Sequence, residues 1–269
     1  CDEPCLCLCG LPMEGKPVQK LAVPPSAESP GLCGPNQVLL VLSGMGPRSS
    51  RSKAEAVLGL ACSQGGSSAS VTTGDGRPDA VLVVGLCGGL TDELSEGQIV
   101  LYSECRSTEA SEPVLSCSPA ISKAIASELA SASIDCERLP GITSRRIATT
   151  RVERMALAKR GAAVVDMESH SILKAAAAAG IPAAVLRVVS DSFNRELPDF
   201  NGALNDSGGL DGRKALGVAL RAPLRTARLL AANRRAIQRL EKALEVVLKA
   251  PCFEVARSEE QSPRAPAGS

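Results

Sequence analysis

The chain has 269 residues, enough for one large α/β domain or two small ones, and its 44% hydrophobic and 22% charged residues are ordinary for a globular protein. A net charge of +1 provides no overall field that recruits nucleic acid, and no apolar stretch has the length of a membrane span. Eleven cysteines without a pair of zinc-type CxxC units, together with one histidine, exclude the common Cys/His metal sites and favour free thiols in a reducing cytoplasm.

Three short apolar runs in the first third of the chain predict buried strands, because strands covered on both faces are continuously apolar. They are Cys5–Gly10, Gln37–Ser43 and Ala80–Val84. The segment Val23–Pro35 is rich in Pro, Ser and Gly and is expected to be a surface connection. Glu14 follows the first run. It is either an acid at a strand end, where ligands bind in α/β proteins, or an ordinary surface glutamate.

A turn containing glycines joins the second run to a predicted helix that extends to about Ala61. Gly44 and Gly46 allow backbone N–H groups to approach an anion, the helix N-terminus favours negative charge, and Arg48 adds positive charge. Ser49 stands where the dinucleotide fingerprint requires a third glycine, so a dinucleotide site is not expected. The turn is interpreted as a site for a small anion or a ribose, or as an ordinary tight turn.

The third run ends in small residues, Gly85-Leu86-Cys87-Gly88-Gly89, which indicates that a ligand or another backbone passes close to it. The next expected elements are a strand at Gln98–Tyr102, a helix at Ala120–Ser131 and a strand fragment at Gly141–Thr143. Thr150 and Glu153 have the spacing of a capping box, which predicts a helix reaching Arg160.

The stretch from Val164 to Asp191 predicts a strand, a helix and a second strand. The predicted elements are Ala162–Val165, Ser169–Ala179 and Ala183–Val189. Carboxylates follow both strands, with Asp166 and Glu168 after the first and Asp191 after the second. Because ligands bind outside strand ends in open α/β sheets, these acids are candidates for a site.

After this unit, Phe193–Arg213 is polar and rich in glycine, and it is expected to be a mobile loop beside the site. Leu216–Lys249 is mostly helical, with a break at Pro223, and arginines alternate with leucines in its first half. This basic helix is either a solvated face or a surface for peripheral contact with an anionic membrane. Residues 1–250 are predicted to form one domain, and residues 251–269 a disordered tail.

Four stretches together resemble the nucleoside phosphorylase and nucleosidase superfamily. They are Leu40–Ser50 (LVLSGMGPRSS), Asp79–Leu101, Val164–Ser171 (VVDMESHS) and Leu186–Asn194 (LRVVSDSFN). DMESH, the DGR at Asp211–Arg213 and the basic leucine-rich helix are similar to the bacterial hopanoid-associated branch, whose proposed reaction removes adenine from adenosylhopane. The resemblance implies a single α/β domain with a mixed, mostly parallel twisted sheet flanked by helices, and a homo-oligomer.

The resemblance also assigns roles to matching positions. Asp191 is implied to protonate the purine as it leaves an oxocarbenium-like sugar, and burial favours the protonated carboxyl group that this step requires. Glu168 is implied to hold the ribose hydroxyls, with Met167 packing below the sugar. The base pocket is assigned to Ser190, Phe193, Cys87 and Gly88.

The nucleophile is left open between water and inorganic phosphate, and no other cofactor is implied. Glu14 is the nearest match to the glutamate that activates water in the hydrolases of the family. The phosphate pocket is assigned to Gly44, Gly46 and Arg48. Leu86-Cys87 stands where phosphorylases commonly place a hydroxyl, which weakens the case for phosphorolysis. His170 is interpreted as a structural hydrogen-bonding residue rather than as a catalyst.

Three functions remain, each for a small-molecule nucleoside partner and none for nucleic acid. The first is cleavage of the N-glycosidic bond of an adenosyl compound in hopanoid side-chain processing. The second is a methylthioadenosine or adenosylhomocysteine nucleosidase, and the third is a non-catalytic nucleoside-binding or storage protein. Glu168 and Asp191 together favour catalysis, because binding alone does not need both acids.

Overall fold

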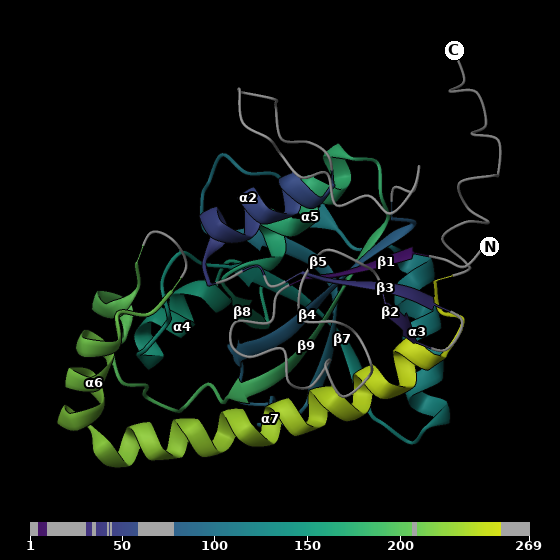
Figure 1. The fold of residues 1–269 in the computed structure, drawn as a ribbon. Coiled ribbons are helices and arrows are strands. Elements are labelled where there is room, and N and C mark those ends of the chain that lie inside the picture. The colour runs from purple at the N-terminus through teal and green to yellow at the C-terminus, as the bar shows by residue number, and fades with distance from the viewer. Residues whose placement is uncertain are drawn as a thin grey trace.

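The structure is a computed structural model that describes residues 5–9, 31–33, 36–41, 43, 45–58, 78–205 and 209–253 (Figure 1). Glu14 and Gly44 lie outside these ranges, as do residues 254–269 of the predicted tail. Nine strands of the described chain form one sheet. They are β1 (Cys5–Cys9), β2 (Gly31–Cys33), β3 (Asn36–Val41), β4 (Ala80–Gly89), β5 (Ile99–Ser107), β6 (Leu115–Ser116), β7 (Cys136–Thr143), β8 (Val164–Asp166) and β9 (Ala183–Asp191).

The sheet is mixed, as predicted, with five parallel and four antiparallel strand pairs among the described residues. The strands β4, β8, β7, β5 and β9 form a closed ring, because β9 pairs with both β4 and β5. Helices lie on both sides of the sheet (Figure 1). They are α2 (Pro47–Val57), α3 (Pro119–Ser131), α4 (Arg151–Ala158), α5 (Ser169–Ala178), α6 (Gly212–Arg221) and α7 (Pro223–Lys249), with a short 3-10 helix, η1, at Asn201–Ala203.

Two hydrophobic clusters cover the two faces of the central strands. In β4, Leu82 and Val84 belong to the cluster that includes α3 and α7, whereas Val81 and Val83 belong to the cluster that includes α2 and α5. This alternation explains why the strand is continuously apolar, since helices cover both of its faces. Complete burial of a Leu or Val side chain contributes roughly 1.5–3 kcal/mol to folding before the cost in conformational entropy.

Two segments differ from the prediction. The expected surface connection Val23–Pro35 contains β2, which pairs antiparallel with β3. The predicted disordered tail begins at residue 251, yet Cys252 and Phe253 are buried in the core. The Asn36 side chain helps to hold this end of the chain, because its amide donates to two carbonyl oxygens at and just beyond the end of α7, at 2.7 and 3.0 Å.

The direction of β8 determines where the acidic residues lie. β8 runs antiparallel to β4 and places Val165 opposite Gly88, whereas β9 runs parallel to β4 and places Asp191 opposite the same glycine. The predicted strand–helix–strand unit is therefore not a parallel crossover, since β8 and β9 run in opposite directions. As a result, Asp166 and Asp191 reach the same end of β4 from opposite sides.

The predicted capping box at the start of α4 is confirmed. The Thr150 hydroxyl accepts a hydrogen bond from the Glu153 N–H at 3.2 Å, and the Glu153 carboxylate accepts from the backbone N–H groups of Thr149 and Thr150 at 2.8 and 3.0 Å. These bonds satisfy N–H groups that have no partner within the helix. They fix the first turn of α4, and with it the buried side chain of Arg154.

Candidate active site

A cavity of about 220 Å³ opens at the end of β4, where β8 and β9 meet it. We call it the central cavity. Its polar lining includes Asp166, Glu168, Arg187, Ser190 and Asp191. Its apolar lining includes Met45, Leu86, Ile147, Met167, Leu197, Phe200 and Leu229. The structure thus brings together Glu168 and Asp191, the two acids to which the sequence assigned roles, although α5 and β9 separate them along the chain.

Asp191 is the last residue of β9, and its side chain is held on both carboxylate oxygens. The Ser190 hydroxyl lies 2.6 Å from Asp191 Oδ1 and 3.1 Å from the Cys87 carbonyl oxygen. Oδ2 forms an ion pair with Arg154. Only 6% of Asp191 is exposed, so its carboxyl group faces the cavity rather than bulk water.

Glu168 also lines the central cavity and is equally well buried, at 5% exposure. Its Oε1 accepts a hydrogen bond from the Gly46 N–H at 3.1 Å, and its Oε2 lies 3.5 Å from the guanidinium group of Arg187. Burial raises the pKa of Glu168 to about 7, in part opposed by the positive charge of Arg187. Near neutral pH this carboxyl group is therefore divided between its two protonation states.

Asp166 anchors the backbone that carries Glu168. Its carboxylate accepts from the hydroxyls of Tyr102 and Thr143, both at 2.8 Å, and from the Glu168 N–H at 3.0 Å. Arg187 lies 3.6 Å away. Burial alone would raise the pKa of Asp166, but the charge of Arg187 and the hydrogen bonds outweigh it and hold this pKa below its usual value. Asp166 is thus ionised at neutral pH.

Arg154 connects α4 to the ends of the two central strands. Besides the ion pair with Asp191, its guanidinium group donates to the carbonyl oxygens of Gly89, Ser192 and Ala148, at 3.2, 2.8 and 3.3 Å. The side chain is 1% exposed. A buried charge requires such partners, since removing one partner leaves a desolvated charge behind. The position of the Asp191 carboxylate therefore depends on α4.

Sequence reasoning did not identify the two buried arginines. Arg187 had a visible signal, because it is the one charged residue in the apolar run Ala183–Val189, and a charge in a buried strand implies a partner. Arg154 had none. It lies in a helix with several other charged residues, and nothing in the sequence separates it from its solvated neighbours.

Phe193, which was expected to face the base, does not line the central cavity. Its ring is buried, and the guanidinium carbon of Arg151 lies 5.1 Å from the ring centroid. Phe200 lines the cavity instead. The difference arises because the chain leaves β9 directly after Asp191, so that Phe193 lies beneath α4 while the following loop returns to the cavity.

The other three base-pocket candidates, Ser190, Cys87 and Gly88, line the central cavity. Burial raises the pKa of the Cys87 thiol far above neutrality, so it is a neutral lining group and not a thiolate nucleophile. In the part of the chain that the structure describes, no group of three or more His, Cys, Asp and Glu side chains is arranged to hold a metal ion.

The glycine-containing turn contributes to the site in a different way from an open anion pocket. The Gly46 N–H is directed to Glu168, and Gly46 has a φ of +90°, which favours glycine at this position. Arg48 is exposed and lines a neighbouring cavity of about 250 Å³ rather than the central cavity. The turn therefore holds the acid expected to bind ribose, while Arg48 lies outside the lining of the cavity.

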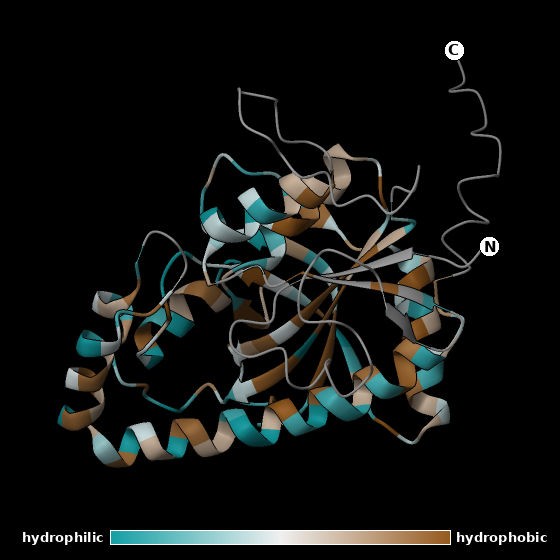
Figure 2. Cartoon of the chain, viewed as in Figure 1, coloured by the Kyte–Doolittle hydropathy of each residue, from teal (hydrophilic) through white to brown (hydrophobic). Residues whose placement is uncertain are grey.

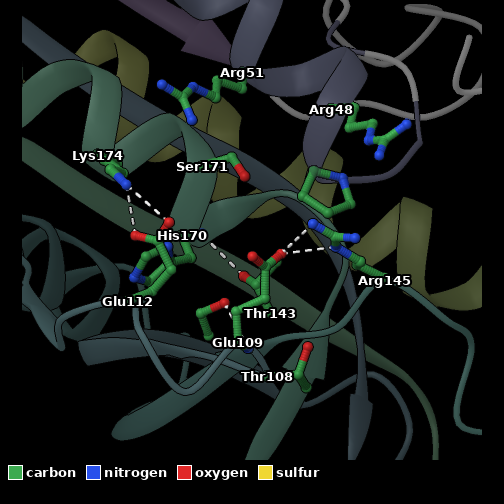
Figure 3. Close-up of a pocket in the computed structure, with 12 residues that line it drawn as sticks. Arg48, Arg51, Thr108, Glu109, Glu112, Thr143, Arg145, His170, Ser171 and Lys174 are labelled. Carbon is green, nitrogen blue, oxygen red and sulfur yellow. Dashed lines mark hydrogen bonds and ion pairs between the residues drawn. The ribbon is translucent and has the colours of Figure 1, made fainter.

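A third cavity, of about 110 Å³, lies beside the first turns of α2 and α5 (Figure 3). Lys174 lies 2.6 Å from Glu112, and Arg145 lies 2.6 Å from Glu109. The other two cations of the lining differ: Arg51 pairs with Glu55, which lies outside the lining, and Arg48 has no ion pair among the described residues. His170 is buried at its edge, with Nε2 at 2.8 Å from the Pro113 carbonyl oxygen. This contact agrees with a structural role for the histidine, which does not line the central cavity.

The chain has recognisable relatives among known protein families. Residues 29–207 match the family model described as the phosphorylase superfamily. The match covers more than half of the chain and includes both Glu168 and Asp191. The chain belongs to the phosphorylase superfamily. It matches none of the curated proteins with which it was compared.

Solved structures show the same superfamily fold at low sequence identity. The futalosine hydrolase of Helicobacter pylori strain 26695 is similar with a TM-score of 0.67 and 13% identity, over 91% of this chain and 97% of that chain. A methylthioadenosine/adenosylhomocysteine nucleosidase from Neisseria meningitidis has a TM-score of 0.65 and 14% identity, over 91% and 98%. An adenosylhomocysteine nucleosidase from Streptococcus pyogenes has a TM-score of 0.66 and 16% identity, over 93% and 98%.

The phosphorylase superfamily match ends before α6 and α7. The second of these helices nevertheless contributes to the site, because Leu229 and Asn233 of α7 form part of the wall of the central cavity. The matched residues thus supply the buried acids, and α7, which the match does not cover, supplies part of the wall of the cavity that contains them.

Proposed function

We propose that the protein cleaves the N-glycosidic bond of an adenosyl compound and releases adenine. The observation that carries this proposal is that Glu168 and Asp191, both buried, line the same cavity. Such bonds break through an oxocarbenium-like sugar, so an enzyme needs a proton for the departing base and a negatively charged group near the sugar hydroxyls. Two buried acids that line one cavity can supply both.

Asp191 is the proton donor in this proposal. Arg154 holds Oδ2, so Oδ1 is the oxygen that exchanges a proton with the base. The Ser190 hydroxyl can accommodate both states of this acid, because a hydroxyl is a donor and an acceptor. It donates to Asp191 when the carboxyl group is ionised, and to the Cys87 carbonyl while accepting from Asp191 when the group is protonated.

Glu168 binds the ribose hydroxyls, with Met167 against the sugar. A carboxylate has two acceptor oxygens and can receive hydrogen bonds from both vicinal hydroxyls, which strengthen as positive charge develops on the ring. The charge of Arg187 and the Gly46 N–H hold Glu168 in place. Ile147, Phe200 and Leu229 then provide apolar surface for the base and for the 5′ substituent.

Adenine is the preferred base because of the structural relatives. One of them, an aspartate-to-asparagine mutant of a Helicobacter pylori nucleosidase with a TM-score of 0.66, contains 5′-methylthioadenosine in its active site. The resemblance of DMESH and of the C-terminal helix to the hopanoid-associated branch favours adenosylhopane and hopanoid side-chain processing. A methylthioadenosine or adenosylhomocysteine nucleosidase is the second candidate, supported by the relatives from Neisseria meningitidis and Streptococcus pyogenes.

The test is a comparison of substrates and acceptors. The protein is incubated with adenosine, methylthioadenosine and an adenosine carrying a long 5′ alkyl chain, with and without inorganic phosphate, while free adenine is measured. Release in the absence of phosphate identifies hydrolysis, and release that requires phosphate identifies phosphorolysis. Binding of these nucleosides without release of adenine under any condition contradicts the proposal and leaves a nucleoside-binding protein.

Gly88→Ala is expected to lower kcat by about 10–100-fold, because small displacements of a reacting group have effects of this size. A Cβ atom at Gly88 would lie 2.9 Å from Asp191 Oδ2 and 3.3 Å from Val165, so the carboxylate, whose Oδ2 pairs with Arg154, must shift. Steady-state rates of adenine release measure the effect. Gly217→Ala is the control, since no atom lies within 4 Å of the added Cβ there. Unchanged kcat in Gly88→Ala would show that the acid tolerates displacement.

A further inference from the structure

The helices α6 and α7 form a hairpin at one edge of the molecule (Figure 1). α6 contains no buried residue, and in α7 the buried residues begin at Ala232. The second half of α7 packs on the sheet through its buried side chains, whereas the first half and α6 extend beyond the core. We call residues 212–231 the basic hairpin. Packing in the core does not account for its sequence.

Large apolar side chains of the basic hairpin are exposed. Leu216, Leu220, Leu224 and Leu230 are 60%, 71%, 74% and 63% exposed. Leu216 and Leu220 are four residues apart and therefore lie on one face of α6. Figure 2 shows hydrophobic residues recurring between hydrophilic ones along both helices. Four largely exposed leucines in one hairpin indicate a surface that is covered in use, because scattered single apolar residues are the normal pattern.

The charge of the basic hairpin and of the adjoining part of α7, up to residue 240, is of one sign. Residues 212–240 contain eight Arg or Lys residues and no Asp or Glu. Three of the eight have an acidic partner, at Asp211, Glu196 and Glu96. Within the described residues, no ion pair is formed by Arg213, Arg221, Arg228, Arg234 or Arg239. An occupant that contacts both leucines and unpaired arginines must offer apolar groups beside negative charges.

We propose that the basic hairpin docks on the surface of a bilayer that contains anionic lipids. An interfacial helix of this kind buries leucines at the level of the acyl chains while its arginines contact the phosphate groups. None of the helices among the described residues is long and apolar enough to cross a membrane, so the contact is peripheral. A second copy of this chain fits less well, because two identical hairpins would bring like charges together.

Docking in this way places the central cavity next to the lipid surface. Leu229 lines the cavity, and its neighbour Leu230 is one of the exposed leucines of the hairpin. A substrate with a nucleoside head and an apolar tail could then present its head to the cavity while the tail remained in the bilayer. This consequence for substrates rests on the proposed function, whereas the docking itself does not.

Flotation with lipid vesicles tests the docking. The full-length protein is mixed with vesicles of phosphatidylcholine alone or with phosphatidylglycerol added, and the bound fraction is measured at low and high salt. Binding is expected only with phosphatidylglycerol and is expected to weaken with salt. Arg221→Ser, Arg228→Ser and Arg234→Ser combined are expected to weaken binding roughly 100-fold. Changing the four leucines to Gln is expected to weaken it about tenfold or more.

Matched controls lie elsewhere on the surface. Lys123→Ser, Arg138→Ser and Lys159→Ser combined remove the same charge from exposed positions, and Val152→Gln with Met155→Gln removes exposed apolar groups of α4. Both control proteins are expected to float with anionic vesicles as the parent does. Circular dichroism establishes that every variant is folded.

Any of three results would overturn the proposal. The first is a parent protein that stays with the soluble fraction at low salt. The second is a leucine variant that floats as well as the parent. The third is a change in the sedimentation coefficient of the leucine variant without lipid, which would show that another copy covers the hairpin. Adenine release from soluble adenosine is measured in parallel, so that failure of the docking and failure of the proposed chemistry are distinguished.

Discussion

Asp191→Asn is expected to lower the rate of adenine release by about 10²–10⁴-fold, the range that a positioned acid contributes. Asparagine retains the shape of the side chain and an oxygen for Arg154, but it cannot transfer a proton to the base. The loss is expected in kcat, because the step that fails follows binding. Single-turnover measurements with adenosine or methylthioadenosine separate this step from substrate binding.

Asp135→Asn is the matched control, since Asp135 is exposed and does not line the central cavity. It is expected to leave the rate unchanged. Thermal unfolding followed by circular dichroism measures how much stability Asp191→Asn loses, because Arg154 loses its charged partner. If the folded Asp191→Asn protein released adenine within about threefold of the parent rate, Asp191 would not be the acid.

Glu168→Gln is expected to lower kcat/KM by about 10²–10³-fold, because the amide has one acceptor oxygen and no charge to stabilise the developing cation. The pH dependence provides a sharper check. Burial raises the pKa of Glu168 to about 7, so in the parent the ionised form is lost as the pH falls below 7. The parent kcat/KM is expected to fall about tenfold per pH unit there, and this limb is expected to be absent in Glu168→Gln.

The pH dependence of the free energy of unfolding is expected to show the titration of Glu168 as well. A glutamate with an ordinary pKa of 4.5 when unfolded and about 7 when folded binds a proton more tightly in the folded state. Between these two pH values the folded protein holds a proton that the unfolded chain has released, so the free energy of unfolding falls as the pH rises from 4.5 to 7. This decline is expected to be smaller in Glu168→Gln. A decline of the same size in both proteins would show that a group other than Glu168 causes it.

The elements that could be predicted are those whose signal is local. The run Ala80–Val84 is continuously apolar, and Ala183–Val189 is apolar except for Arg187, because helices cover both faces of their strands. Such runs can be recognised without knowing the fold. The capping box at Thr150 depends on residues three apart and was found for the same reason. The two acids could be identified because each follows a predicted strand.

The features that could not be predicted depend on contacts between distant segments. β8 is three residues long, and its direction is decided by its pairing with β4 and β7 rather than by its own sequence. The exchange of Phe193 for Phe200 in the cavity depends on the path of a loop. Arg154 forms an ion pair with Asp191, which lies 37 residues further along the chain, and no sequence pattern near Arg154 indicates that contact.

The cap of α4 has a consequence for anyone who alters the outer surface of this protein. Glu153 is exposed and does not line the central cavity, yet the next residue, Arg154, carries the guanidinium group that forms the ion pair with Asp191, the proposed proton donor. Replacing Glu153 by a neutral residue would weaken the first turn of α4 and allow the Arg154 guanidinium group to move away from Asp191. An exposed glutamate that solubility engineering would treat as free to change therefore supports the position of the Asp191 carboxylate.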